Sequence, residues 1–147
     1  MDGVSIEKRR MSVRNFLDTN VLVYTDDHSN PAKQEVALDL IGECRATNRG
    51  VVSLQVLQEY FNVATRKLGV DAAVAKGKVE LFAELHLVIP GLDDVLAAID
   101  LQRLHKFSFW DAMIVRSAVR GLCKRLYSED MQHGRRIEGI EIVNPFA

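Results

Sequence analysis

The sequence predicts an α/β fold built on a parallel sheet. Short apolar runs of strand length alternate with longer segments whose apolar residues recur at helical spacing, a pattern typical of parallel sheets covered by helices. The chain has 147 residues, a length that favours one domain with its own core. Hydrophobic residues make up 48% of it and charged residues 27%, which excludes a disordered or collagen-like chain.

The first half of the chain predicts two strands and four helices. Residues 14–18 form a short buried strand, and residues 19–23 turn into a helix. A turn-rich segment over 26–31 precedes a helix over 32–47. A brief strand over 51–52 leads to Ser53, which we expect to cap a helix that runs to about residue 67. Another helix is predicted over 71–85.

The second half completes a sheet of five strands. A strand over 87–89 is followed by a helix that Asp93 caps and that reaches residue 105. The next helix opens at Asp111 and ends at Gly121, a C-cap candidate. The last strands cover 122–127 and 139–143. Residues 1–11 are expected to be a flexible N-terminal extension, and residues 12–147 the folded domain.

Composition predicts a cytoplasmic protein without a membrane anchor. No apolar run is long enough to span a bilayer, and the N-terminus lacks the apolar core of a secretory signal. Cys44 and Cys123 match no metal-binding or CxxC spacing, so we expect buried, reduced thiols. The net charge is −1. Residues 101–136, however, hold eight basic and three acidic residues, which suits either a phosphate-binding face or ordinary solvated charges.

Four acidic residues stand where predicted strands end or helices begin: Asp18, Glu59, Asp111 and Asp130. Each alone fits an ordinary role as a helix cap, a turn residue or part of a solvated helix face. The carboxyl ends of parallel strands meet at one edge of a sheet, so we expect the four to converge. Converging carboxylates repel one another unless a cation lies between them. Hard oxygen donors favour Mg²⁺ or Mn²⁺ over Zn²⁺.

Four segments of the chain, residues 16–24, 59–63, 109–114 and 126–131, resemble the signature blocks of the PIN domain family. The four acids lie 41, 52 and 19 residues apart, in the order of that family. The resemblance runs from about residue 12 to the C-terminus. It implies a three-layer α/β/α sandwich with a five-stranded, mainly parallel sheet. It also implies a Mg²⁺-dependent endoribonuclease, most often the VapC-like toxin of a type II toxin–antitoxin module.

The resemblance also implies roles for single residues. The catalytic quartet would be Asp18, Glu59, Asp111 and Asp130, with Asp18, Asp111 and Asp130 holding Mg²⁺ or, as a substitute, Mn²⁺. The supporting polar residues are Thr19, Asn20, Ser128 and Asn62, the last from a polar stripe on the Glu59 helix. A homodimer, an RNA substrate and a cognate antitoxin protein are implied as partners. The ten residues before Met11 depart from the family pattern.

Several residues near the acids are candidates for RNA contact. Arg116 follows Asp111 by five residues, and His133 and Arg135 follow Asp130. Trp110 fits either stacking on a base or packing in the core. We expect 5′-phosphate and 3′-hydroxyl products, because no paired histidines offer a route through the 2′-hydroxyl. The alternative is a catalytically inert PIN-like adaptor that binds RNA or protein.

Overall fold

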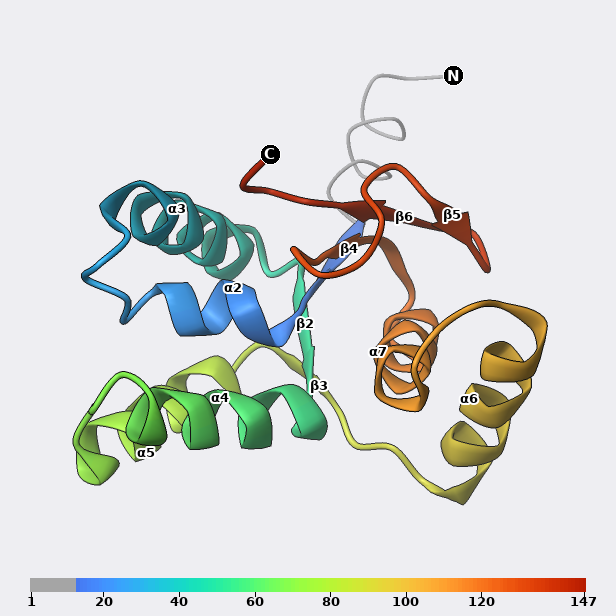
Figure 1. Ribbon diagram of the computed structural model, residues 1–147, viewed down its shortest axis with the longest axis horizontal. Helices are drawn as coiled ribbons and strands as arrows, with labels where there is room; N and C mark the ends of the chain where they lie inside the picture. Colours follow the sequence, from blue (N-terminus) through green and yellow to red (C-terminus); the bar gives the residue numbers. More distant parts are fainter. Residues whose placement is uncertain (1–12) are drawn as a thin grey trace.

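The computed structural model describes residues 13–147, so the expected extension over 1–11 lies outside the described residues (Figure 1). The described helices and strands follow one another in an alternating order, as the sequence predicts. They are β1 (Arg14–Leu17), α2 (Thr19–Tyr24), α3 (Pro31–Thr47), β2 (Gly50–Ser53), α4 (Leu54–Arg66), α5 (Ala72–Phe82), β3 (His86–Val88), α6 (Leu92–Leu104), α7 (Phe109–Arg120), β4 (Cys123–Tyr127), β5 (Arg136–Ile137) and β6 (Ile140–Val143).

The strands form one mainly parallel sheet with the order β3-β2-β1-β4-β6-β5. This confirms the predicted fold class, but the described sheet has six strands where five were expected. The additional strand, β5, pairs antiparallel with β6. The turn between them places Glu138 and Gly139 at φ 50° and 79°, as a two-residue hairpin requires. Two residues are too few to show an alternating pattern, so β5 leaves no periodic signal in the sequence.

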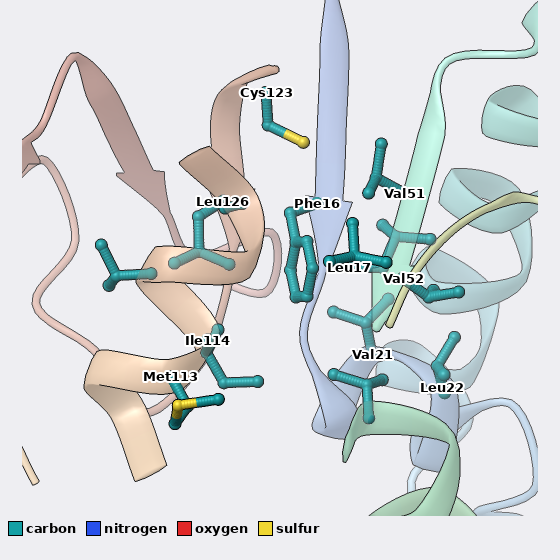
Figure 2. Packing of buried hydrophobic residues seen from close by; sticks show 14 of the residues in the cluster. Phe16, Leu17, Val21, Leu22, Val51, Val52, Met113, Ile114, Cys123 and Leu126 are labelled. Atoms are coloured by element: carbon teal, nitrogen blue, oxygen red, sulfur yellow. The ribbon is translucent and has the colours of Figure 1, made fainter. Parts of the chain in front are cut away.

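Helices cover both faces of the sheet in three layers. Helices α2 to α5 lie on one side, and α6 and α7 lie on the other (Figure 1). Strand β1 lies in the middle, where its successive side chains Phe16 and Leu17 point to opposite faces and are fully buried. Figure 2 shows Phe16 among Leu126 and Ile114, and Leu17 beside residues of β2 and α2. Burial on both faces explains why two successive residues of β1, Phe16 and Leu17, are both apolar.

Most predicted boundaries hold to within one or two residues, and the caps explain the differences. Ser53 caps α4 as expected, accepting a hydrogen bond from the Val56 N–H. Helix α6 begins one residue before Asp93, so the expectation that Asp93 caps it is wrong, and Gly91 is the N-cap. Helix α7 begins two residues before Asp111, because Ser108 supplies the cap. Asp111 therefore lies in the first turn of α7.

The order of the strands predicts where a ligand binds. From β1 the chain continues to its neighbour β2, whereas after β4 it passes through the edge strand β5 to β6, the neighbour of β4 on the other side. The two neighbouring strands β1 and β4 therefore form a topological switch point. In open parallel sheets, the crevice beyond the carboxyl ends of such strands is the usual binding site. Asp18 follows β1, and Ser128 to Asp130 follow β4.

Both cysteines are free and buried, as the sequence predicts. Burial raises the pKa of the Cys44 thiol to about 11 and that of the Cys123 thiol to about 12. Both thiols are therefore protonated at neutral pH and pack as small apolar side chains. None of the helices within residues 13–147 is both long and apolar enough to cross a lipid bilayer.

Candidate active site

A pocket of about 240 Å³ opens at the switch point between β1 and β4. All four predicted acids line it, each from a different place in the chain. Its wall also includes four polar, uncharged side chains and three mainly apolar ones. The lining residues are Asp18, Thr19, Asn20, Gln55, Glu59, Asn62, Val63, Trp110, Asp111, Ile114 and Asp130. The predicted convergence of the four acids is confirmed.

Asp18 is the most buried of the four acids, with 7% of its surface exposed. It is the N-cap of α2: its Oδ1 accepts a hydrogen bond from the Thr19 N–H over 2.7 Å. Its Oδ2 accepts a hydrogen bond from the Ser128 hydroxyl over 2.8 Å. Burial raises the pKa of Asp18 to about 6 against these hydrogen bonds, with added repulsion from Glu59 and Asp111. The same Asp18 side chain therefore caps α2 and lines the pocket.

Glu59 reaches the pocket from the second turn of α4, where neighbouring polar side chains hold both of its oxygens. The Thr19 hydroxyl donates to Glu59 Oε2 over 2.6 Å, and Gln55 Nε2 donates to Glu59 Oε1 over 3.0 Å. The same amide nitrogen reaches the carbonyl oxygen of Trp110 at 3.4 Å. Gln55 thereby links the acid on α4 to the beginning of α7.

The other two acids stand opposite, on α7 and on the loop after β4. Burial, together with the charges of Asp130 and Glu59, raises the pKa of Asp111 above its ordinary value. Asp130 is exposed, and Asn20 Nδ2 donates to its Oδ2 over 2.6 Å. Thr19, Asn20 and Ser128 thus each orient one of the acids, whereas Asn62 lines the pocket as an exposed side chain.

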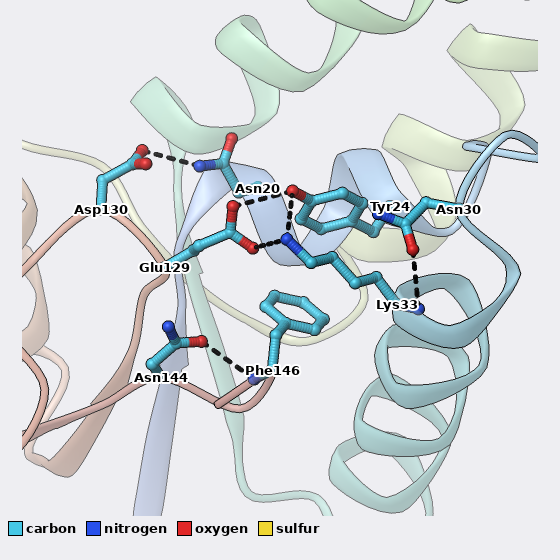
Figure 3. Close-up of polar contacts among 8 residues, drawn as sticks. All are labelled: Asn20, Tyr24, Asn30, Lys33, Glu129, Asp130, Asn144 and Phe146. Atoms are coloured by element: carbon cyan, nitrogen blue, oxygen red, sulfur yellow. Dashed lines mark hydrogen bonds and ion pairs between the residues drawn. The ribbon is translucent and has the colours of Figure 1, made fainter.

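A second layer of contacts fixes the loop that carries Asp130 (Figure 3). Glu129 accepts hydrogen bonds from the Tyr24 hydroxyl over 2.8 Å and from Lys33 Nζ over 2.9 Å. The Phe146 ring meets the Tyr24 ring edge to face, with centroids 4.8 Å apart, and the Lys33 ammonium lies over both rings. Side chains from α2 and α3 and from the C-terminal segment thus hold the residue next to Asp130.

The donor set of the pocket suits a hard divalent cation such as Mg²⁺, because carboxylate, hydroxyl and amide oxygens line it without a sulfur atom. Within residues 13–147, no three acidic, histidine or cysteine side chains lie together as a group that could hold a metal ion. Asp18, Glu59 and Asp130 each accept hydrogen bonds from neighbouring side chains instead. This arrangement fits Mg²⁺, which commonly keeps several waters and takes only one or two carboxylates directly.

The three predicted RNA-contact residues do not line this pocket. The Arg116 side chain turns away and pairs with the buried Asp94 of α6, Nε to Oδ1, over 2.9 Å. His133 Nδ1 accepts a hydrogen bond from the Asn144 N–H, and the Arg135 guanidinium lies 4.5 Å from the centre of the Phe107 ring. Their contact with RNA stays a prediction, and Arg116 has a structural partner that the sequence did not indicate.

Trp110 and Gln55 are pocket residues that the sequence left undecided or missed. Trp110 is 65% exposed, so the expectation of core packing is wrong for this side chain. Gln55 belongs to the polar stripe of Glu59 and Asn62 along α4, and that stripe is the signal that indicates it. Tyr24, Lys33 and Glu129 carry no comparable signal, because Glu129 lies 105 and 96 residues from the other two.

Comparison with known proteins identifies the family. The model of the PIN domain matches residues 16–136, which contain all four acids of the pocket. The chain belongs to the PIN domain family, and the resemblance in its sequence is thereby confirmed.

One similar solved structure is VapC20 from Mycobacterium tuberculosis, described as a Sarcin-Ricin loop cleaving toxin. It matches with a TM-score of 0.62 and 21% identity, over 79% of this chain and 89% of the other. At that identity the likeness shows the fold. No curated protein sequence matches the chain.

Proposed function

We propose that this chain is a Mg²⁺-dependent endoribonuclease and the toxin of a toxin–antitoxin pair. The observation that carries the proposal is the convergence of Asp18, Glu59, Asp111 and Asp130 in one pocket at the switch point of the sheet. Membership of the PIN domain family supports it. The likeness in fold to a toxin described as cleaving the Sarcin-Ricin loop supports the choice of RNA as substrate.

In this proposal Asp18, Asp111 and Asp130 hold Mg²⁺, directly or through water, and Mn²⁺ can replace it. The bound cation would neutralise the phosphodiester charge and lower the pKa of a water molecule that acts as the nucleophile. Glu59 orients that water, and its own orientation is fixed by the Thr19 hydroxyl and the Gln55 amide. In the same way, the Ser128 hydroxyl fixes the orientation of Asp18, and the Asn20 amide fixes that of Asp130.

The proposed products carry a 5′-phosphate and a 3′-hydroxyl. Cleavage through the RNA 2′-hydroxyl needs a general base and a general acid near the scissile bond, a task most often given to histidine. No histidine from residues 13–147 lines the pocket. A water nucleophile leaves the 3′-oxygen as the leaving group, which gives these products.

The experiment is cleavage of a mixed tRNA and ribosomal RNA pool by the purified protein, freed of any bound partner. It is run with Mg²⁺, with Mn²⁺ and with EDTA. Asp111→Asn serves as the inactive variant, and Asp100→Asn, an exposed acid on α6, is the matched control. Discrete bands that EDTA and Asp111→Asn abolish, and that Asp100→Asn retains, support the proposal. The absence of both cleavage and Mn²⁺ binding would overturn the proposal in favour of an inert adaptor.

The toxin assignment is tested in cells. Induction of the chain should arrest growth, and Asp111→Asn should remove the arrest without lowering the amount of protein. A cognate antitoxin would copurify with the chain and restore growth when expressed beside it. The proposed homodimer is tested by light scattering of the purified protein. A monomer would contradict it.

A further inference from the structure

We propose that Trp110 is a stacking platform for an unpaired nucleobase, next to the phosphodiester bond that is cleaved. This inference rests on the proposed function, since it assigns the part of the same pocket that holds RNA. Trp110 is the single tryptophan of the chain. It lies in the first turn of α7, beside Asp111, and lines the pocket of the four acids.

The exposure of this ring distinguishes it from the other aromatic side chains near the pocket. Trp110 is 65% exposed, although a tryptophan ring has a large apolar surface to bury. Leu92, Leu104 and Leu122 are more exposed still, but none of the three lines the pocket. A large apolar ring kept open to solvent at the opening of a polar pocket indicates a ligand with an aromatic face.

The ring is also held firmly in place. It stacks on Phe109 with centroids 5.2 Å apart and planes 13° from parallel, and Phe109 itself packs against the core. Gln55 Nε2 contacts the Trp110 carbonyl oxygen at 3.4 Å and donates to Glu59. A base that stacks on Trp110 would therefore lie at a fixed position relative to Glu59 and Asp111.

Because the pocket is lined by acidic side chains, stacking on an aromatic ring can hold RNA there where charge attraction cannot. No lysine or arginine of residues 13–147 lines the pocket, and four of its lining residues are acidic. The protein therefore offers the RNA backbone no direct attraction inside it. Stacking on an aromatic side chain contributes affinity without regard to charge and needs an unpaired base.

A protein partner fits a different surface better. A separate, mainly apolar groove of about 430 Å³ lies between α4 and α5, lined by Leu54, Leu57, Phe61 and Val79 with two polar residues. Trp110 is not part of that groove. Eight of the ten residues that line the acid pocket with Trp110 are polar or acidic, as expected where RNA is bound.

The test uses the fluorescence of Trp110, which reports on this position alone because the chain has no other tryptophan. The probes are a short single-stranded oligoadenylate and a chain of abasic ribose phosphates of the same length and charge. Binding is measured without cleavage, on the wild-type protein in EDTA and on Asp111→Asn in Mg²⁺. We expect saturable quenching by oligoadenylate and none by the abasic chain. Equal responses to both probes, or no response to either, would overturn the proposal.

Variants measured by anisotropy of a labelled oligoadenylate complete the test. Trp110→Ala should weaken binding by roughly 5- to 150-fold, the range of one lost stack, and Trp110→Phe should retain most of the affinity. Leu104→Ala, which removes an exposed apolar side chain elsewhere, should change nothing. If Trp110→Ala leaves RNA affinity intact but changes the molecular mass in solution, Trp110 belongs to a protein interface and the proposal is wrong. If RNA quenches the Trp110 fluorescence but the protein never cleaves RNA, this inference stands and the proposed nuclease function is refuted.

Discussion

The ammonium of Lys33 lies 2.9 Å from the carboxylate of Glu129, and this contact joins α3 to the loop that carries Asp130. Glu129 also accepts the Tyr24 hydroxyl hydrogen bond, while Asn20, one turn earlier on α2, donates to Asp130. Two successive acids of one loop are thus held by two helices. Glu129 acts on the site through the position of its neighbour.

Lys33→Met should lower cleavage by about tenfold or less, the lower end of the effect of groups that orient metal ligands. The variant keeps the apolar stem over the Tyr24 and Phe146 rings but loses the hydrogen bonds to Glu129 and Tyr24. Lys33→Arg is the control and should retain most activity. The measurement is the Mg²⁺ concentration that gives half-maximal cleavage, which should rise. A loss of stability with an unchanged Mg²⁺ requirement would contradict this role.

Asp18→Asn should abolish cleavage and yet stabilise the metal-free protein at neutral pH. Burial raises the pKa of Asp18 to about 6 in the folded state. A raised pKa means that the charged carboxylate costs stability above that pH and that protonation recovers it at lower pH. The free energy of unfolding of the variant at pH 7.5 should exceed that of the wild type by about 1–3 kcal/mol.

Urea unfolding in EDTA across pH 4 to 8 checks this. The difference between the two proteins should shrink as the pH falls through about 6 towards the ordinary pKa of aspartate, about 4. Mg²⁺ should raise the midpoint of the wild type more than that of Asp18→Asn. A variant that is less stable than the wild type at pH 7.5 would show that the hydrogen bonds of Asp18 outweigh the cost of its buried charge.

Thr19→Val should lower the rate of cleavage about 10- to 100-fold, because it removes the hydroxyl that donates to Glu59 while keeping the shape of the side chain. Thr19→Ser keeps the hydroxyl and serves as the matched control. The backbone N–H of residue 19 still donates its hydrogen bond to Asp18 in both variants. Single-turnover kinetics with saturating protein separate the rate from binding. Equal rates of cleavage for the two variants would show that the Thr19 hydroxyl does not orient Glu59.

Asp94→Asn should destabilise the fold by about 1–3 kcal/mol, since a hydrogen-bonded ion pair to a buried carboxylate is lost. Asp94 pairs with Arg116 and with Arg120 of α7. Although burial alone would raise it, the Gly91 N–H and the two guanidinium groups hold the pKa of Asp94 below its ordinary value. Its contribution is therefore present at neutral pH and lost as the pH falls through that lowered value.

A double-mutant cycle with Arg116→Ala separates the two roles considered for that arginine. If Arg116 acts mainly through Asp94, the two substitutions should be far from additive in the free energy of unfolding. Affinity for RNA should then change little in Arg116→Ala. Additive effects on stability, together with weakened RNA binding, would restore Arg116 as an RNA contact.

The four acids could be predicted because each carries a local signal in the sequence. Asp18 directly follows an apolar strand and precedes a helix, and Asp130 follows another strand within three residues. Given parallel strands, their meeting at one edge follows from topology. Glu59 stands on a helix with a regular polar stripe, which gives its orientation.

The contacts that orient these acids depend on the fold and could not be predicted in the same way. Lys33 and Glu129 are 96 residues apart, and nothing local in either segment indicates the other. Arg116 illustrates the reverse error: proximity to Asp111 in the sequence suggested the pocket, but on a helix five residues turn a side chain well away from it. Its partner Asp94 lies on α6, which packs closely against α7.

The pairing of β1 with β4 has a consequence for the order of events during synthesis. Asp18 and Ser128, hydrogen-bonded across this pairing, are 110 residues apart, and β4 is itself flanked by β6 at residues 140–143. A growing chain on the ribosome has made every residue between Asp18 and Ser128 before the second half of the pocket exists. Contacts of such long sequence separation also form late and slowly. The four carboxylates can therefore first meet only after Asp130 has been synthesised, long after Asp18 and Glu59.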